Sequence, residues 1–190
     1  ASSQAQRLLT TLVKDKIQSI VFTQARVLAE LIYRSTKESL EHEDVFHKSR
    51  SKKSVSLAEM ISSYRGGYLP EKRREIEQKL FSGKLRGVIS TNALELGIDI
   101  GGLDACLLVG FPGTIASTWQ RAGRAGRSHE DSMVIYIASN SPLDQFFVYN
   151  PAYFFSQKFE RAVIDPDNPY ILSIHLSCAS YELPLVEKDR

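Results

Sequence analysis

The chain has 190 residues, the size of one domain, and its 43% hydrophobic and 24% charged residues are typical of a packed globular domain and exclude a disordered chain. Its 24 Lys and Arg residues against 22 Asp and Glu residues leave a net charge of +2, which excludes a polybasic binder, so contacts with nucleic acid would depend on individually placed groups. No apolar stretch approaches the roughly 20 residues that cross a bilayer, so we expect no membrane partner.

The two cysteines, Cys106 and Cys178, have neither the spacing of a zinc site nor that of a disulfide framework. We therefore expect no metal site in this chain and a reducing compartment, the cytoplasm. The first residues show no basic segment followed by an apolar core, so we expect no secretory signal.

Hydrophobic periodicity predicts alternating helices and strands. The expected elements, in chain order, are a helix at 5–13, a strand at 17–22, a helix at 25–40, a polar segment at 41–56, a short apolar piece at 60–64, a helix at 70–81, strands at 85–90 and 105–109, a helix at 115–122 and a strand at 133–138. Strands separated by helices predict crossover connections and a mainly parallel sheet, so the expected fold class is α/β.

The sequence changes character from about residue 141, where aromatic residues and prolines become frequent. The aromatic stretch at 146–155 predicts helices that pack outside the sheet, and residues 171–185 predict a further helix whose apolar side has no evident partner. We therefore divide the chain into a domain at 1–145 and a helical extension at 146–190, which leads toward a further domain of a longer polypeptide.

Polar and glycine residues follow the predicted strands at their carboxyl ends, where open parallel sheets bind ligands. These ends carry Thr23-Gln24-Ala25-Arg26, Arg65-Gly66-Gly67, Thr91-Asn92 and Gly110-Phe111-Pro112-Gly113. Hydroxyl, amide, guanidinium and glycine groups gathered on one edge are the composition that a phosphate-binding edge needs.

The segment 120–127 holds three arginines, Arg121, Arg124 and Arg127, separated by small residues. A guanidinium group stays charged at neutral pH, and its rigid fork of donors matches phosphate oxygens. The pattern therefore favours an anion site, although a solvated basic loop also explains such runs.

The segment 91–99 combines a strand end with a turn. Thr91 and Asn92 open a short helical turn whose free N–H groups could hold a phosphate, and Asp99, after Gly97, could accept a hydrogen bond from a sugar hydroxyl. Alternatively, Thr91 or Asn92 is a helix cap and Asp99 an ordinary turn residue.

Together these stretches resemble the second RecA-like domain of superfamily 2 helicases and translocases. Residues 120–127 match motif VI, Q-x-x-G-R-x-G-R, and residues 91–99 match motif V, T-x-x-x-x-x-G-x-D; residues 20–26 are similar to motif IV, and 64–69 to the Y-x-G-G-L loop that follows it. The phrases at 64–71 and 173–185 resemble the MrfA-type (mitomycin repair factor) DNA helicases, whose four-cysteine zinc domain has no counterpart in this sequence. The resemblance implies a RecA-like three-layer α/β/α domain with a mainly parallel sheet and a helical C-terminal extension.

The resemblance also implies roles around a nucleotide that is held between two RecA-like domains. Arg124 and Arg127 would be arginine fingers that stabilise charge on the transferred phosphoryl group, and Gln120 would orient the phosphate or the attacking water. Gly97 and Asp99 would contact the nucleotide. The cofactors would be ATP and Mg²⁺, bound mainly by the first RecA-like domain of the same polypeptide, which is the expected partner.

The second implied partner is single-stranded or partly duplex DNA, met on the bacterial nucleoid. The implied contacts with its backbone come from Thr91, Asn92, Arg65, Gly66, Gly67, Thr23 and Arg26.

The sequence has no G-x-x-x-x-G-K-[ST] phosphate loop and no acidic motif that closes a strand to bind Mg²⁺, so we expect the isolated chain to be inactive as an ATPase. The expected function is the second motor domain of an ATP-dependent superfamily 2 DNA helicase or translocase in DNA repair. Two alternatives stay open: an RNA helicase or non-unwinding translocase motor domain, and a non-enzymatic nucleic-acid-binding α/β module.

Overall fold

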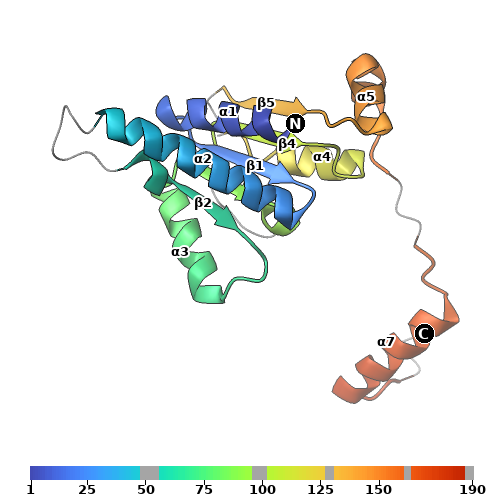
Figure 1. The fold of residues 1–190 in the computed structure, drawn as a ribbon. Coiled ribbons are helices and arrows are strands. Elements are labelled where there is room, and N and C mark those ends of the chain that lie inside the picture. Colours follow the sequence, from blue (N-terminus) through green and yellow to red (C-terminus); the bar gives the residue numbers. More distant parts are fainter. Residues whose placement is uncertain (48–55, 96–101, 127–130, 161–163, 187–190) are drawn as a thin grey trace. The chain divides into compact units, whose positions relative to one another are not determined.

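A computed structural model of the chain describes residues 1–47, 56–95, 102–126, 131–160 and 164–186, and for residues 44–47 it describes the backbone alone. Five strands form one sheet in the order β2-β3-β1-β4-β5, and all neighbouring strands are parallel (Figure 1). They are β1 (Ser19–Thr23), β2 (Ile61–Tyr64), β3 (Gly87–Ser90), β4 (Ala105–Val109) and β5 (Met133–Ile137). The predicted parallel α/β sheet is confirmed.

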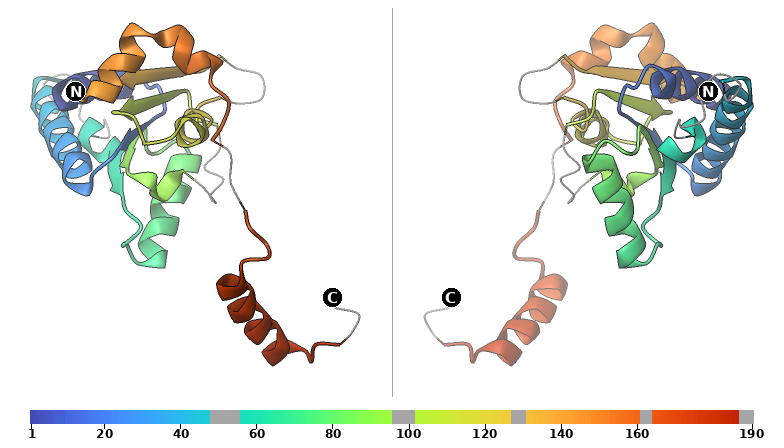
Figure 2. Two further views of the ribbon diagram at one scale, coloured as in Figure 1. Left: turned by 90° about the vertical axis from the view of Figure 1, so that its right-hand side faces the viewer. Right: turned by 90° about the vertical axis from the view of Figure 1, so that its left-hand side faces the viewer.

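Helices cover both faces of the sheet. They are α1 (Ser2–Lys14), α2 (Arg26–His47), α3 (Pro70–Phe81), α4 (Ile115–Ala122), α5 (Pro142–Tyr149) and α6 (Pro151–Ser156), with short 3₁₀ turns η1 (Leu57–Met60) and η2 (Asn92–Leu94). α1 and α2 lie on one face and α3 and α4 on the other, which confirms the expected three layers (Figure 2).

Alternate residues of each strand point to opposite faces, and in β1, β3 and β4 both sets are buried. Val21 of β1 packs in the cluster that includes Leu9 of α1, whereas its neighbour Ile20 packs with Leu80 of α3. A strand buried on both faces needs a continuous apolar sequence, and the central strand β4 has one, Ala105–Val109. This two-sided burial is why the strands were recognisable as short apolar runs.

The polar segment expected to begin at residue 41 is wrong for its first part, because α2 continues to His47. Two ion pairs support the extra turns. Glu41 lies 3.9 Å from Lys37 within α2, and the Glu43 carboxylate lies 2.8 Å from the Lys14 ammonium group of α1. The polarity of residues 41–43 therefore reflects a stretch of helix that faces solvent and pairs with Lys37 and Lys14.

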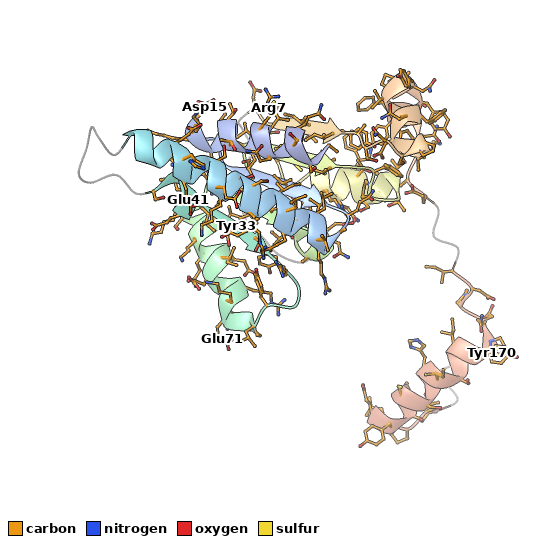
Figure 3. All side chains as sticks on the ribbon, in the orientation of Figure 1. Arg7, Asp15, Tyr33, Glu41, Glu71 and Tyr170 are labelled. Atoms are coloured by element: carbon orange, nitrogen blue, oxygen red, sulfur yellow. The ribbon has the colours of Figure 1, made fainter. Side chains whose placement is uncertain are left out.

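The chain forms two compact units, 1–159 and 160–190. The aromatic helices α5 and α6 belong to the first unit, where Phe147 packs on Phe111 with ring centroids 4.7 Å apart. The second unit contains α7 (Pro169–Glu182), which begins at an Asn168 cap and carries Tyr170 in its first turn (Figure 3). The division expected between 145 and 146 stays a prediction. No helix among the described residues is long and apolar enough to span a bilayer.

Gly87 of β3 lies close to two side chains of α1 and one of β2. A Cβ atom at this position would lie 3.0 Å from Leu9 Cδ1, 3.1 Å from Ile61 Cγ2 and 3.3 Å from Val13 Cγ2. Three buried side chains would have to move together to admit one methyl group. Only glycine lets strand and helix approach this closely.

We predict that Gly87→Ala lowers the free energy of unfolding by about 1–3 kcal/mol, because overpacking forces buried side chains off their rotamers. Urea unfolding of the chain measures the change. The matched control is Gly67→Ala, where a Cβ atom meets nothing within 4 Å, and its effect should stay within about 0.5 kcal/mol. Equal stability of the Gly87→Ala variant and the wild type would contradict the packing constraint.

Candidate nucleic-acid interface

A groove of about 510 Å³ lies at the carboxyl edge of the sheet. It is lined by Thr23, Gln24, Arg26, Thr91, Asn92, Phe111, Pro112, Gly113 and Arg121. Since the strands are parallel, β1, β3 and β4 all end at this edge, which is why segments far apart in the sequence meet here. The structure thus brings together Thr23, Arg26, Thr91 and Asn92, four of the residues expected to contact a nucleic-acid backbone.

These four residues differ in what they offer to a ligand. Thr23 is buried, and its hydroxyl lies 3.1 Å from the Ala25 carbonyl and 3.5 Å from the Ser90 carbonyl, so its proton is used inside the chain. Arg26 and Asn92 are exposed and Thr91 is half-buried. Thr23 is therefore part of the buried surface of the groove. Among these four residues, the hydrogen-bond donors that face solvent belong to Arg26, Asn92 and Thr91.

One wall of the groove is the loop that leaves β4. Gly110 adopts a positive φ of 79°, which turns the chain sharply at the strand end, and a Cβ atom there would lie 3.2 Å from Gln24 Nε2. The Gln24 side-chain amide donates a hydrogen bond to the Phe111 carbonyl. The loops after β1 and β4 are therefore joined directly.

Asp144 of α5 also holds the loop after β4 in place, through a hydrogen bond with Phe111. Its carboxylate, 1% exposed, accepts hydrogen bonds from the Phe111 amide at 2.9 Å, the Tyr136 hydroxyl at 2.7 Å and the Ser139 amide at 2.6 Å. Burial pushes the pKa of Asp144 upward, but the hydrogen bonds from Ser139, Tyr136 and Phe111 outweigh it and hold the pKa below its ordinary value. Burial and the bond to Asp144 raise the pKa of Tyr136.

A buried ion pair closes the floor of the groove beside η2. Arg121 Nε lies 2.8 Å from Glu95 Oε2, and both side chains are about nine-tenths buried. The Ser117 hydroxyl donates to Glu95 Oε1 at 2.6 Å, and the Arg121 guanidinium stacks over the Phe22 ring at 5.5 Å. The charge of Arg121 is therefore balanced inside the fold.

The rest of the arginine-rich stretch follows α4. Arg124 is half-buried, and its Nε donates to the main-chain oxygen of Glu95 at 3.2 Å. Gln120 is exposed on α4. Arg127, Gly97 and Asp99 lie outside the described residues, so their expected roles stay predictions.

The Arg65-Gly66-Gly67 loop follows β2, next to this groove but outside its lining. A Cβ atom on Gly66 would lie 3.9 Å from Ala93 of η2, so the two loops are neighbours. Arg65 forms an ion pair with Glu30 of α2 and lies 5.8 Å from the Tyr68 ring centroid. Its guanidinium is thus held by the fold, and Gly67 faces open space.

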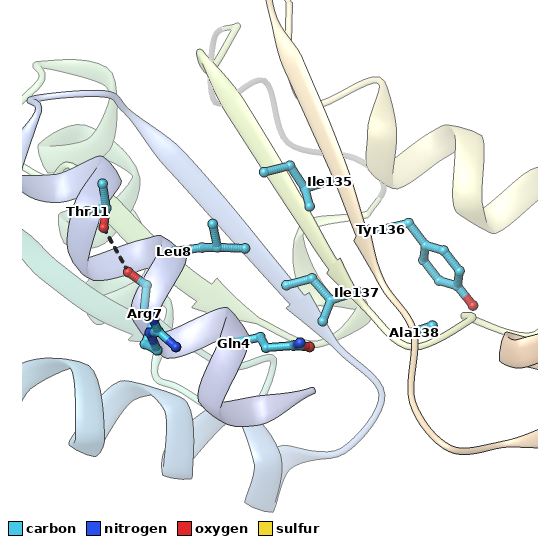
Figure 4. A pocket seen from close by; sticks show the side chains of 8 residues that line it. All are labelled: Gln4, Arg7, Leu8, Thr11, Ile135, Tyr136, Ile137 and Ala138. Atoms are coloured by element: carbon cyan, nitrogen blue, oxygen red, sulfur yellow. Dashed lines mark hydrogen bonds between the residues drawn. The ribbon is translucent and has the colours of Figure 1, made fainter. Parts of the chain in front are cut away.

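A second hollow, of about 600 Å³, lies between α1 and the edge strand β5. Figure 4 shows Leu8 of α1 facing Ile135 and Ile137, whereas Tyr136 points to the opposite face of the strand. Arg7 is the one charged side chain among its lining residues. Gln4 and Thr11 line it as well, and like Arg7 they belong to α1, whereas the polar residues of the carboxyl-edge groove come from several loops.

The described residues contain no group of three or more His, Cys, Asp or Glu side chains that could hold a metal ion.

Sequence reasoning missed Glu95 and Asp144, the two carboxylates that organise this edge. An acidic residue between Leu94 and Leu96 indicates a buried partner, because an isolated charge there would be costly. Asp144 lies three residues after Ser141, whose side chain accepts from the Asp144 amide, and this spacing is typical of a helix start. Neither signal identifies the partner, which lies elsewhere in the sequence.

We predict that Asp144→Asn lowers the free energy of unfolding at pH 7 by about 1–3 kcal/mol, because an amide cannot accept all the hydrogen bonds that the carboxylate accepts. The lowered pKa of Asp144 means that its contribution is complete above the unfolded-state pKa, about 3.9, and is lost as the pH falls through the folded-state value. The difference between the wild type and the variant should therefore shrink in acid.

Urea unfolding at pH 7, 5 and 3 measures this difference. The control is Asp131→Asn, an exposed carboxylate, whose unfolding curve should follow that of the wild type at each pH. A wild-type advantage that stays constant down to pH 3 would contradict the role assigned to the carboxylate charge.

Comparison with known proteins gives consistent matches over nearly the whole chain. Residues 3–129 match the family described as Helicase conserved C-terminal domain. The "Uncharacterized ATP-dependent helicase YprA" of Bacillus subtilis is 46% identical over 184 residues, which are 97% of this chain and 23% of that protein. The "ATP-dependent helicase hrq1" of Schizosaccharomyces pombe is 40% identical over 185 residues, 97% of this chain and 17% of that protein.

Solved structures agree with these relatives. The crystal structure of the DUF1998 helicase MrfA bound to DNA and AMPPNP has a TM-score of 0.84 and 45% identity, and the match covers 96% of this chain and 24% of that one. The chain thus spans a quarter or less of the length of the proteins that it resembles.

Proposed function

Because the chain belongs to the helicase conserved C-terminal domain family, we propose that it is the second motor domain of an ATP-dependent superfamily 2 DNA helicase or translocase that acts in DNA repair. One observation carries the proposal: Glu95 contacts both the groove and the arginine-bearing turn. Its carboxylate pairs with Arg121, which lines a groove whose hydrogen-bond donors suit phosphate, and its main-chain oxygen accepts a hydrogen bond from Arg124. A nucleic-acid motor needs these two features, a grip on a backbone and a cation for a nucleotide, within one domain.

The groove supports binding of a nucleic-acid backbone rather than of bases. Its outward donors are Arg26, Asn92 and Thr91, which suit phosphate oxygens. Phe111, the aromatic residue in the lining, is 7% exposed, so it offers little surface on which a base could stack. Binding through these groups would be largely indifferent to base sequence.

The nucleotide side of the proposal rests on Arg124, Arg127 and Gln120, with Gly97 and Asp99 as contacts to the nucleotide. The guanidinium of Arg124 suits this role because it keeps its charge and is oriented by the Glu95 carbonyl. ATP, when bound with Mg²⁺ by a first RecA-like domain, supplies the phosphoryl group and the free energy of its transfer. Arg124 and Arg127 would stabilise the charge that develops on that group.

The weaker patch consists of Arg65, Gly66 and Gly67. Its support is its position beside η2, since Gly66 is a neighbour of Ala93. Arg65 would have to exchange its ion pair with Glu30 for a phosphate, so we assign it a smaller share of the grip. The site of action that fits this function is DNA of the bacterial nucleoid, in the cytoplasm.

We predict that Arg124→Ala, made in a longer polypeptide that also contains the first RecA-like domain, lowers DNA-stimulated ATP turnover by about 10³-fold. DNA affinity measured without nucleotide should change by less than about twofold, because Arg124 is outside the groove lining. Steady-state phosphate release and fluorescence anisotropy with a single-stranded oligonucleotide measure the two quantities.

The matched control is Arg74→Ala, which removes an exposed arginine of α3 and should leave both quantities unchanged. Weaker DNA binding with intact ATP turnover in the Arg124→Ala variant would instead support a non-enzymatic nucleic-acid-binding module. Duplex unwinding with DNA and RNA substrates then separates the DNA helicase from an RNA helicase or a non-unwinding translocase.

We predict that Arg26→Ala weakens binding of single-stranded DNA about equally for all sequences and reduces the slope of log affinity against log salt by about 0.7, the value for one phosphate contact. Titrations of two unrelated oligonucleotides between 50 and 200 mM salt measure the slope. Arg34→Ala is the control, since Arg34 lies two turns further along α2, outside the groove lining, and pairs with Glu30 at 3.2 Å. An unchanged slope in the Arg26→Ala variant would exclude Arg26 as a phosphate contact.

A further inference from the structure

Glu95 is connected to both sides of the proposed motor site. Its main-chain N–H donates to the Asn92 carbonyl at 3.0 Å and so closes the turn that presents Asn92 to the groove. Its main-chain oxygen accepts from Arg124 Nε at 3.2 Å. A single peptide segment therefore touches a groove residue at one end and the nucleotide-side arginine at the other.

The Glu95 side chain ties the same segment to α4. Its two carboxylate oxygens accept from Arg121 at 2.8 Å and from Ser117 at 2.6 Å, one helical turn apart on the same helix face. Arg121 in turn lines the groove, and its carbonyl accepts from the Arg124 amide at 3.1 Å. The main-chain and side-chain contacts of Glu95 thus connect η2, α4 and the Arg124 turn in one hydrogen-bonded network.

Burial makes this connection stiff. The carboxylate and guanidinium are about nine-tenths buried, so separating them would leave two buried charges, each without its counter-charge. Breaking this ion pair is therefore a costly way for the site to respond to a ligand in the groove. An exposed pair such as Lys72–Glu75 could break and be solvated instead.

We propose that Glu95 is a positioning residue that transmits occupancy of the nucleic-acid groove to Arg124, and occupancy of the nucleotide side back to the groove; this rests on the proposed function. Glu95 touches neither ligand. It sets the distance between Asn92 and Arg124 through its main chain, and the ion pair with Arg121 keeps that main chain in place.

The test measures coupling, which a residue that only stabilises the fold would not change. The coupling factor is the ratio of dissociation constants for a single-stranded DNA oligonucleotide without and with AMPPNP, and linkage requires the same factor for AMPPNP with and without DNA. Measurements use the longer polypeptide that contains the first RecA-like domain. Glu95→Gln should bring the factor closer to one by about fivefold or more, with DNA affinity in the absence of nucleotide changed by less than about twofold.

Ser117→Ala provides a milder variant that removes one hydrogen bond to the carboxylate and leaves the ion pair intact. It should reduce the coupling factor by about twofold, and the effects of Glu95→Gln and Ser117→Ala should not multiply in the double variant, because both act on one carboxylate. The control is Glu75→Gln, a carboxylate paired with Lys72 at 2.8 Å and Lys79 at 2.6 Å on the exposed side of α3, which should leave the factor unchanged.

A lower melting temperature with an unchanged coupling factor in Glu95→Gln would overturn the proposal, because the pair would then support the fold alone. If Glu95→Gln does not fold, Ser117→Ala decides: a reduced factor supports the proposal and an unchanged factor overturns it. A wild-type protein without any coupling between DNA and AMPPNP would overturn the proposed function as well, which distinguishes that failure from the failure of Glu95 alone.

Discussion

Five strands running in one direction set the conditions for everything else in this chain, because a parallel sheet is stable only when both of its faces are covered. Each crossover carries a helix back over a face, and every strand then ends at the same edge. The loops at that edge take no part in the hydrogen bonding between strands and are not buried within the sheet. They can therefore hold polar residues, which the buried strands exclude. Thr91 and Arg26 are far apart in the chain and line one groove for this reason.

Internal ion pairs decide which of the cations near that edge can meet a ligand. Arg121 is neutralised by Glu95, and Arg65 by Glu30, whereas Arg26 is exposed. The low net charge of +2 therefore does not prevent the groove from binding an anion. The electrostatic field in the groove depends on where the cations lie and not on how many the chain has. The same placement makes Arg121 a support of the site.

The aromatic helices after the sheet also contribute to the groove. α5 begins at Ser141, and Asp144 in its first turn holds the Phe111 amide that forms one wall. Phe147 then packs on Phe111. Helix α5 lies outside the sheet, but it holds the Phe111 loop in place. The Asp144 carboxylate of this helix accepts the hydrogen bond of the buried Phe111 amide.

The sequence by itself determined the parallel α/β class and most element positions, because short apolar runs and helical periodicity are local properties; β4 and α4 match the expected residues throughout. Its motifs also determined the family and the segments that meet at the edge. Only the tertiary structure decided that Arg121 is paired with Glu95, that Thr23 is buried and that Asp144 braces the Phe111 loop. These depend on which distant residue lies within hydrogen-bond distance, and local patterns carry no information about that partner.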